Sequence, residues 1–119
     1  MLNNGIKILL TFVFMAQRDV IELVKKYVRL LNKEGLLISK SFLYGSYAHN
    51  SSTPESDIDI LLVSEIFDTA GIEAKTKAWL IADKVDYRIE PYSVGLKSYI
   101  REESIMADIA EKTGIEIVV

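Results

Sequence analysis

The sequence predicts a small α/β (α+β) domain in which a mixed central sheet of three to four strands is flanked by helices. Two apolar runs of strand length, residues 39–44 and 58–64, are joined by a polar loop. Segments with helical spacing of apolar residues precede and follow them. The order helix, strand, strand, helix, strand, helix is typical of one α/β unit, and 119 residues are enough for a single core.

The first helix is predicted to begin at Asp19, because Glu22 three residues later completes a capping box, and to end at Gly35. Residues 15–119 then form the domain, and residues 1–14 precede it as an apolar extension that we do not expect to be part of its core. This extension is shorter than the roughly 20 apolar residues of a membrane span. We expect it to be a continuation of the helix or the product of a start codon upstream of Met15. A strand and a secretory or membrane segment are the alternatives.

The second half of the chain contains the remaining elements. A helix is predicted over residues 70–84, where apolar residues recur at helical spacing. A third strand is predicted over residues 85–92, because Val85, Tyr87 and Ile89 alternate with polar residues. Residues 94–113 are predicted to be helical with a break, and residues 115–119 to form a final strand or a docked tail.

The stretch from Gly45 to Asp59 carries the residues expected to perform chemistry. Gly45 permits a tight turn at the end of the first strand, and Ser46 offers a hydroxyl and an N–H group to a phosphate. Ten residues later, Asp57 and Asp59 are separated by one residue at the start of the second strand, so their side chains share one face. Two adjacent carboxylates repel each other unless a cation lies between them. Mg²⁺ suits such a pair, because it binds carboxylates together with substrate phosphates.

The same stretch resembles the signature of the DNA polymerase β-like nucleotidyltransferases, and in particular of the minimal nucleotidyltransferases, G-S-x-A-x-G-x-x-x-x-x-S-D-x-D. The chain matches this pattern at six positions and has Asn50 where the family usually has Gly, and His49 where it often has Arg or Lys. Asn tolerates left-handed backbone better than other non-glycine residues, so the turn can form. The matched positions are Gly45, Ser46, Ala48, Ser56, Asp57 and Asp59.

A third carboxylate is expected beside the pair, since two metal ions need more than two ligands. Asp86 is the best candidate, because it lies near the start of the predicted third strand, where the family has its third acidic residue. Asp83 is the competitor, but it falls at the end of a helix. Arg88 shares the face of Asp86 and could pair with it or contact a triphosphate. His49 is either a weak anion contact or a bystander.

Composition narrows the class of partner. The net charge is −3, and the sequence gives no support for binding long nucleic acid, which usually needs a basic face. The absence of cysteine excludes disulfides and thiolate metal sites and agrees with a cytoplasmic protein.

The resemblance implies a nucleotidyltransferase-fold domain that binds ATP or another NTP. It also implies two Mg²⁺ ions in the site, with Mn²⁺ as an alternative. Asp57, Asp59 and Asp86 would be the catalytic metal ligands, and Gly45 and Ser46 would bind the nucleotide phosphates. The implied reaction transfers a nucleoside monophosphate to an acceptor hydroxyl, and the expected case is AMP from ATP. Relatives of this class are often paired with a small helical HEPN or substrate-binding protein, which they modify as antitoxins. The alternatives are a nucleotide-binding or partner-neutralising module without turnover and a nucleotidyltransferase for small molecules of the aminoglycoside kind. The sequence does not decide the oligomeric state.

Overall fold

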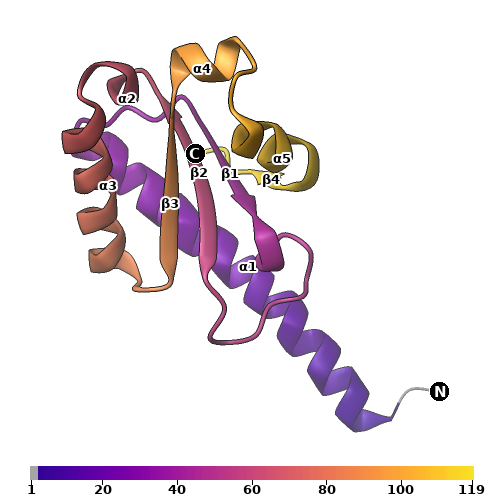
Figure 1. Cartoon of the computed structure of the whole chain (residues 1–119). Helices are drawn as coiled ribbons and strands as arrows, with labels where there is room; N and C mark the ends of the chain where they lie inside the picture. Colours follow the sequence, from indigo (N-terminus) through magenta and orange to yellow (C-terminus); the bar gives the residue numbers. More distant parts are fainter. Residues whose placement is uncertain (1–2) are drawn as a thin grey trace.

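The chain forms a four-stranded mixed sheet with helices on both faces, which confirms the predicted fold class (Figure 1). The computed structural model describes the backbone of residues 3–119 and the side chains of residues 3–7 and 17–119. The strand order is β3-β2-β1-β4. β1 is antiparallel to β2 and β4, whereas β2 and β3 are parallel. The strands are β1 (Lys40–Tyr44), β2 (Ile58–Ser64), β3 (Ile89–Gly95) and β4 (Ile115–Glu116).

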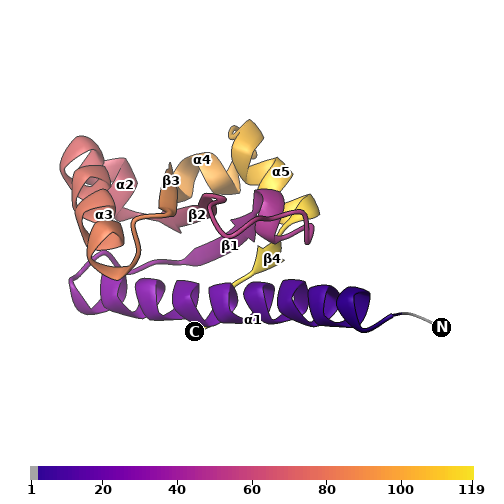
Figure 2. The same ribbon diagram turned by 90° about the horizontal axis from the view of Figure 1, so that it is seen from below.

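The central strand β2 contributes to a separate core on each face of the sheet. Ile58, Ile60 and Leu62 are fully buried on the face covered by α1 (Asn4–Lys33) and α3 (Gly71–Val85). Leu61 and Val63 pack on the opposite face against α5 (Ile105–Thr113). Figure 2 shows α1 on one side of the sheet, with α4 (Leu96–Ile100) and α5 on the other. Because side chains alternate along a strand, Asp59 lies on the face that α5 covers.

Helix α1 begins earlier than the sequence predicts. Its N-cap is Asn3, whose side chain accepts a hydrogen bond from the Ile6 N–H. Asp19 therefore lies inside a continuous helix, and the predicted capping box is wrong as a helix start. A capping box is a local preference, and here the residues before it are themselves helical. The predicted end is confirmed, because Gly35 has a φ of +91° and the Leu36 N–H bonds to the Leu31 carbonyl, as in a Schellman motif.

The N-terminal turns of α1 extend past the sheet (Figure 2). The apolar extension, residues 1–14, supplies these turns from Asn4 onward, which agrees with the helical alternative for its backbone. The side chains of residues 8–16 lie outside the described residues, so the expectation that residues 1–14 are not part of the core stays a prediction. In the described part of the chain, no helix combines the length and the apolar character needed to cross a membrane.

The third strand begins later than predicted. Helix α3 continues to Val85, and Asp86 is its C-cap, so the strand starts only at Ile89. The Asp86 carboxylate accepts a hydrogen bond from the Arg88 N–H at 2.9 Å, and the Asp86 carbonyl accepts one from the Ile89 N–H at 3.2 Å. A side chain that bonds the backbone two residues ahead forms an Asx turn. Residues 86–88 are therefore a turn, although polar and apolar residues alternate here as they would in a strand. A short helix that the sequence did not predict, α2 (Ile66–Thr69), links β2 to α3.

Candidate active site

Three polar side chains form a row across neighbouring strands on the face that α5 covers. Tyr44, the last residue of β1, is paired in register with Asp59 in β2, and Asp59 is paired with Glu90 in β3. Residues paired across neighbouring strands have side chains about 5 Å apart on the same face. The sheet therefore places the carboxylates of Asp59 and Glu90 side by side, with the phenol of Tyr44 next to them.

Asp57 adds a third carboxylate at the mouth of this row, one residue before β2 begins. Partial burial, and then the negative charge of Asp57, raise the pKa of Asp59 above its ordinary value. Desolvation, the charges of Asp57 and Asp59 and a hydrogen bond with Asp57 likewise raise the pKa of Glu90. Burial together with the charges of Asp59, Tyr92 and Glu90 raises the pKa of Tyr44 to about 12. These shifts show a concentration of negative charge that a cation would relieve.

A tight turn at the end of β1 lies against this acidic cluster. The 3₁₀ turn η1 (Gly45–Tyr47) starts at Gly45, whose φ is +75°. A Cβ atom at Gly45 would lie 2.5 Å from Oδ2 of Asp59, so only glycine permits this approach of the backbone to the carboxylate. The turn ends near Asn50, whose φ of +56° confirms the left-handed backbone expected where the family has glycine.

Ser46 follows Gly45 and is partly exposed. Its carbonyl accepts hydrogen bonds from the N–H groups of His49 and Ser51. Its hydroxyl makes no hydrogen bond to any described residue, so it is free to bind a ligand. The structure places Gly45 against Asp59 and Asp57 close enough to raise the pKa of Asp59, and Ser46 is the next residue of the turn. Their roles as ligands of a metal or a nucleotide stay a prediction.

Asp86 does not join this cluster. The prediction that it lies on the polar face of the third strand is wrong, because the strand begins three residues later. Its carboxylate instead binds Arg88, with 3.0 Å from Arg88 Nη2 to Asp86 Oδ2. Hydrogen bonds from the Arg88 side chain hold the pKa of Asp86 below its ordinary value. Of the two interactions left open for Arg88, the structure contains the pairing with Asp86.

Glu90 is the acidic residue that sequence analysis missed. Glu90 and Asp86 are four residues apart, so both would lie on the same face of a strand. The alternation of polar and apolar residues therefore could not distinguish them. A usable signal is the Asp-x-Arg sequence directly after a helix, which favours an Asx turn and delays the strand. With the strand starting at Ile89, the first polar residue on its outer face is Glu90.

The donor set fits a hard divalent cation. Asp57, Asp59 and Glu90 supply only carboxylate oxygens, which are the ligands that Mg²⁺ and Mn²⁺ prefer. Among the described residues, no group of three acidic, histidine or cysteine side chains is arranged so that it could hold a metal ion by itself. A cluster that needs phosphate oxygens to complete it is expected for Mg²⁺, which binds one or two carboxylates plus substrate phosphates.

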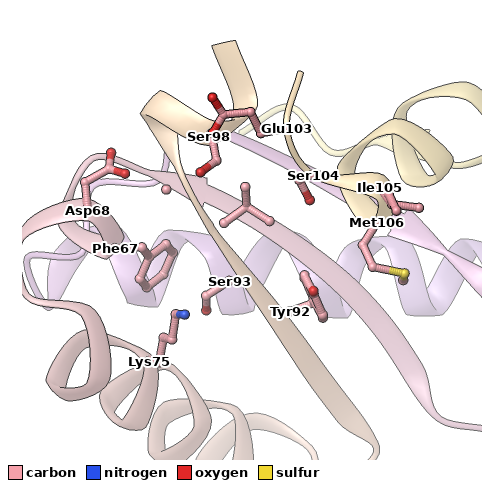
Figure 3. A pocket seen from close by; sticks show the side chains of 12 residues that line it. Phe67, Asp68, Lys75, Tyr92, Ser93, Ser98, Glu103, Ser104, Ile105 and Met106 are labelled. Atoms are coloured by element: carbon pink, nitrogen blue, oxygen red, sulfur yellow. The ribbon is translucent and has the colours of Figure 1, made fainter. Parts of the chain in front are cut away.

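A pocket of about 480 Å³ lies along the C-terminal half of β3 (Figure 3). Tyr92 lines this pocket and is also close enough to Tyr44 to affect its pKa, so it lies between the two sites. Figure 3 shows Phe67 and Lys75 on one side of β3, with Ile105 and Met106 on the other. Most of the remaining lining is polar: Asp68, Ser93, Ser98, Glu103 and Ser104.

The comparison with protein families is decisive for the class of the protein. Residues 21–115 match the family described as the nucleotidyltransferase domain. The chain belongs to this family. The match includes the turn at Gly45, all three carboxylates and the whole of β3, and it agrees with the resemblance to the minimal nucleotidyltransferases of the DNA polymerase β-like superfamily.

The nucleotidyltransferase fold is also found among solved structures. A Sulfolobus solfataricus protein, itself described as a candidate nucleotidyltransferase, superposes with a TM-score of 0.59 at 17% sequence identity. The alignment covers 75% of this chain and 78% of that one. At this identity the likeness shows a shared fold. The search of curated proteins gives no significant match.

Proposed function

We propose that this nucleotidyltransferase domain is a Mg²⁺-dependent enzyme that transfers a nucleoside monophosphate, AMP from ATP, to an acceptor hydroxyl. The observation that carries the proposal is the meeting of three carboxylates beside a glycine turn. Asp59 and Glu90 lie on the neighbouring strands β2 and β3, and Asp57 directly precedes β2. The Gly45 backbone lies so close to the Asp59 carboxylate that a Cβ atom would not fit between them.

Each residue of the site has a proposed role. Asp57, Asp59 and Glu90 would hold the metal, with Mn²⁺ as a substitute for Mg²⁺. The metal, when bound, neutralises phosphate charge and lowers the pKa of the acceptor hydroxyl. Ser46 donates its hydroxyl to the terminal phosphates of the nucleotide. Most of the catalytic effect would come from positioning and electrostatics, as is usual for phosphoryl transfer.

The reaction forms one bond and breaks one. The acceptor oxygen attacks the α-phosphorus, the bond from that phosphorus to the bridging oxygen breaks, and pyrophosphate leaves. The acceptor proton passes to a carboxylate. Glu90 is the proposed base, because it is exposed on the edge strand β3, where an acceptor can reach it.

We propose that the acceptor is a partner protein, which would make this chain the antitoxin-like member of a two-protein system. An exposed apolar stripe on α3 supports a protein partner. Ile72, Trp79 and Leu80 lie on its outer side and are 86%, 45% and 59% exposed. Residues seven and eight apart fall on one side of a helix, and exposed apolar surface of this kind marks interaction sites. The same stripe also favours the second candidate, a module that neutralises its partner without turnover.

A transfer assay distinguishes these functions. ATP labelled at its α-phosphate is incubated with Mg²⁺ and the protein alone, with a helical protein from a neighbouring reading frame, or with small-molecule alcohols. We expect label on the partner's hydroxyl side chains, and none with Asp59→Asn or Glu90→Gln. Transfer to an aminoglycoside without any partner would overturn the protein acceptor and leave the enzyme class intact. Tight partner binding without transfer would favour the neutralising module.

A further inference from the structure

The side chain of Arg88 bridges the start of β3 and the loop between η1 and β2. Its Nε and Nη2 atoms each donate to a different oxygen of Asp86, both at 3.0 Å. Its Nη1 atom donates to the Tyr47 hydroxyl at 3.1 Å and to the Pro54 carbonyl at 3.3 Å. One guanidinium thus binds Asp86 in the turn before β3, the last residue of η1, and one residue of the loop that follows η1.

The two loop contacts lie on either side of the motif's polar segment. Tyr47 ends the η1 turn that starts at Gly45, is only 2% exposed, and donates its own hydroxyl to the Thr53 carbonyl at 3.2 Å. Pro54 comes three residues before Asp57. The Arg88 backbone adds a further tie, because its carbonyl accepts from the N–H of Ile58 at 2.7 Å. Arg88 therefore connects the phosphate turn and the residues before Asp57 to the strand that carries Glu90.

The geometry of this contact requires arginine. A guanidinium presents donors in a planar fork that matches a carboxylate with two bonds and leaves further N–H groups for other acceptors. A lysine ammonium could reach one of these partners at a time. The ion pair is also sheltered, with side-chain exposures of 22% for Arg88 and 19% for Asp86, so solvent weakens it less than a surface pair.

We propose that Arg88, oriented by Asp86, is a positioning residue that locks the loop over residues 48–57. These contacts set the positions of Asp57 and of the η1 turn, which contains Ser46, relative to Asp59 and Glu90. Neither Arg88 nor Asp86 touches the metal or the nucleotide in this role. The proposal rests on the proposed function, because what it positions is the Mg²⁺–nucleotide site.

The test uses four variants of the Arg88 contacts, of which Arg88→Lys tests rescue by a different cation, and one matched control. Arg88→Met removes the fork, Asp86→Asn removes its anchor, and Tyr47→Phe removes only the hydroxyl while keeping the buried ring. Lys112→Met is the control, because it breaks an ion pair of 3.1 Å with Asp108 in α5, away from the loop. Amide hydrogen exchange at Thr53 and Ser56 is measured without nucleotide, and the affinity for ATP with Mg²⁺ is measured by calorimetry.

We expect the amides of Thr53 and Ser56 to exchange about tenfold faster or more in Arg88→Met, since each lost bond involves a charged donor. ATP affinity with Mg²⁺ falls by a similar factor, Arg88→Lys restores part of each loss, and the control changes neither. Tyr47→Phe gives a smaller effect in the same direction, and its unchanged melting temperature shows that the fold is intact.

Unchanged exchange in Arg88→Met would overturn the lock. Faster exchange with wild-type ATP affinity would show that the loop is held but that holding it does not position the site. If the wild-type protein itself binds no ATP with Mg²⁺, the proposed function and the positioning role fail together. The exchange data still decide whether the lock exists.

Discussion

Replacing Gly45 with alanine tests the contact between the η1 turn and the Asp59 carboxylate. Gly45 has a φ of +75°, and an L-residue in left-handed backbone costs about 1–2 kcal/mol. The new Cβ would also lie 2.5 Å from Oδ2 of Asp59, closer than real Cβ contacts, so the carboxylate has to move. Forcing that side chain off its rotamer adds about 0.5–1.5 kcal/mol. We therefore expect Gly45→Ala to lower the free energy of unfolding by about 1.5–3.5 kcal/mol.

The chain contains a matched control for the backbone part of this cost. Gly35, after the end of α1, has a φ of +91°, and a Cβ there would meet nothing within 4 Å. Gly35→Ala should therefore cost only the conformational part, about 1–2 kcal/mol. Urea denaturation of both variants gives the difference directly, provided that the slope with denaturant is unchanged.

A third background isolates the carboxylate itself. In Asp59→Ala the oxygen atoms are gone, and the remaining Cβ would be 3.6 Å from the new methyl, an ordinary contact. The cost of Gly45→Ala in this background should fall to that of Gly35→Ala. An equal cost of Gly45→Ala with and without the Asp59 carboxylate would refute the reasoning, because the turn would then not press against Asp59.

Three further predictions concern the charges and the N-terminus. The double variant Asp57→Asn with Asp59→Asn should lose metal binding yet melt no lower than the metal-free wild type, because mutual repulsion is removed; a much lower melting temperature would make the pair structural. Because the pKa of Asp59 is raised in the folded state, the protonated Asp59 carboxyl contributes to stability at low pH. This contribution to the free energy of unfolding is lost as the pH rises through the pKa of Asp59 in the folded protein. The lowered pKa of Asp86 has the opposite sign, so Asp86→Asn should cost stability at neutral pH and less once the pH falls below the ordinary value of 3.8. Urea denaturation of each variant across this range, without metal, checks both signs, and parallel pH profiles would contradict them. Removal of residues 1–14 should leave the protein soluble, with a loss of about 1 kcal/mol at most from the Asn3 cap; aggregation would show that the segment covers apolar surface.

Local chemistry explains which parts of the fold the sequence predicts. The β2 strand is apolar at almost every position and is covered on both faces, so its pattern is unambiguous. Gly35, Gly45 and Asn50 all occupy left-handed backbone, as turn chemistry predicts. These features depend on a few neighbouring residues, so they can be predicted from the sequence without knowledge of the tertiary contacts.

The errors arise where tertiary pairing decides the outcome. Asp86 and Glu90 occupy equivalent positions in an alternating pattern, and the Asx turn at Asp86 together with the parallel pairing of Ile89 with Ile58 sets where the strand begins. The carboxylate that completes the acidic row is therefore defined by the register between strands far apart in sequence. The same holds for Arg88, whose partners in the loop lie 34 and 41 residues away.

The most direct test of the metal–nucleotide site is calorimetric titration of ATP into the protein with Mg²⁺ and again with excess chelator. The account predicts binding with Mg²⁺, a loss of that binding with chelator, and the same loss in Asp59→Asn with Mg²⁺ present. Asp86→Asn should retain Mg²⁺-dependent binding at reduced affinity, because its carboxylate orients Arg88 and does not hold the metal. Equal ATP affinity with and without chelator would contradict the central claim that the carboxylates of β2 and β3 form a metal-dependent nucleotide site.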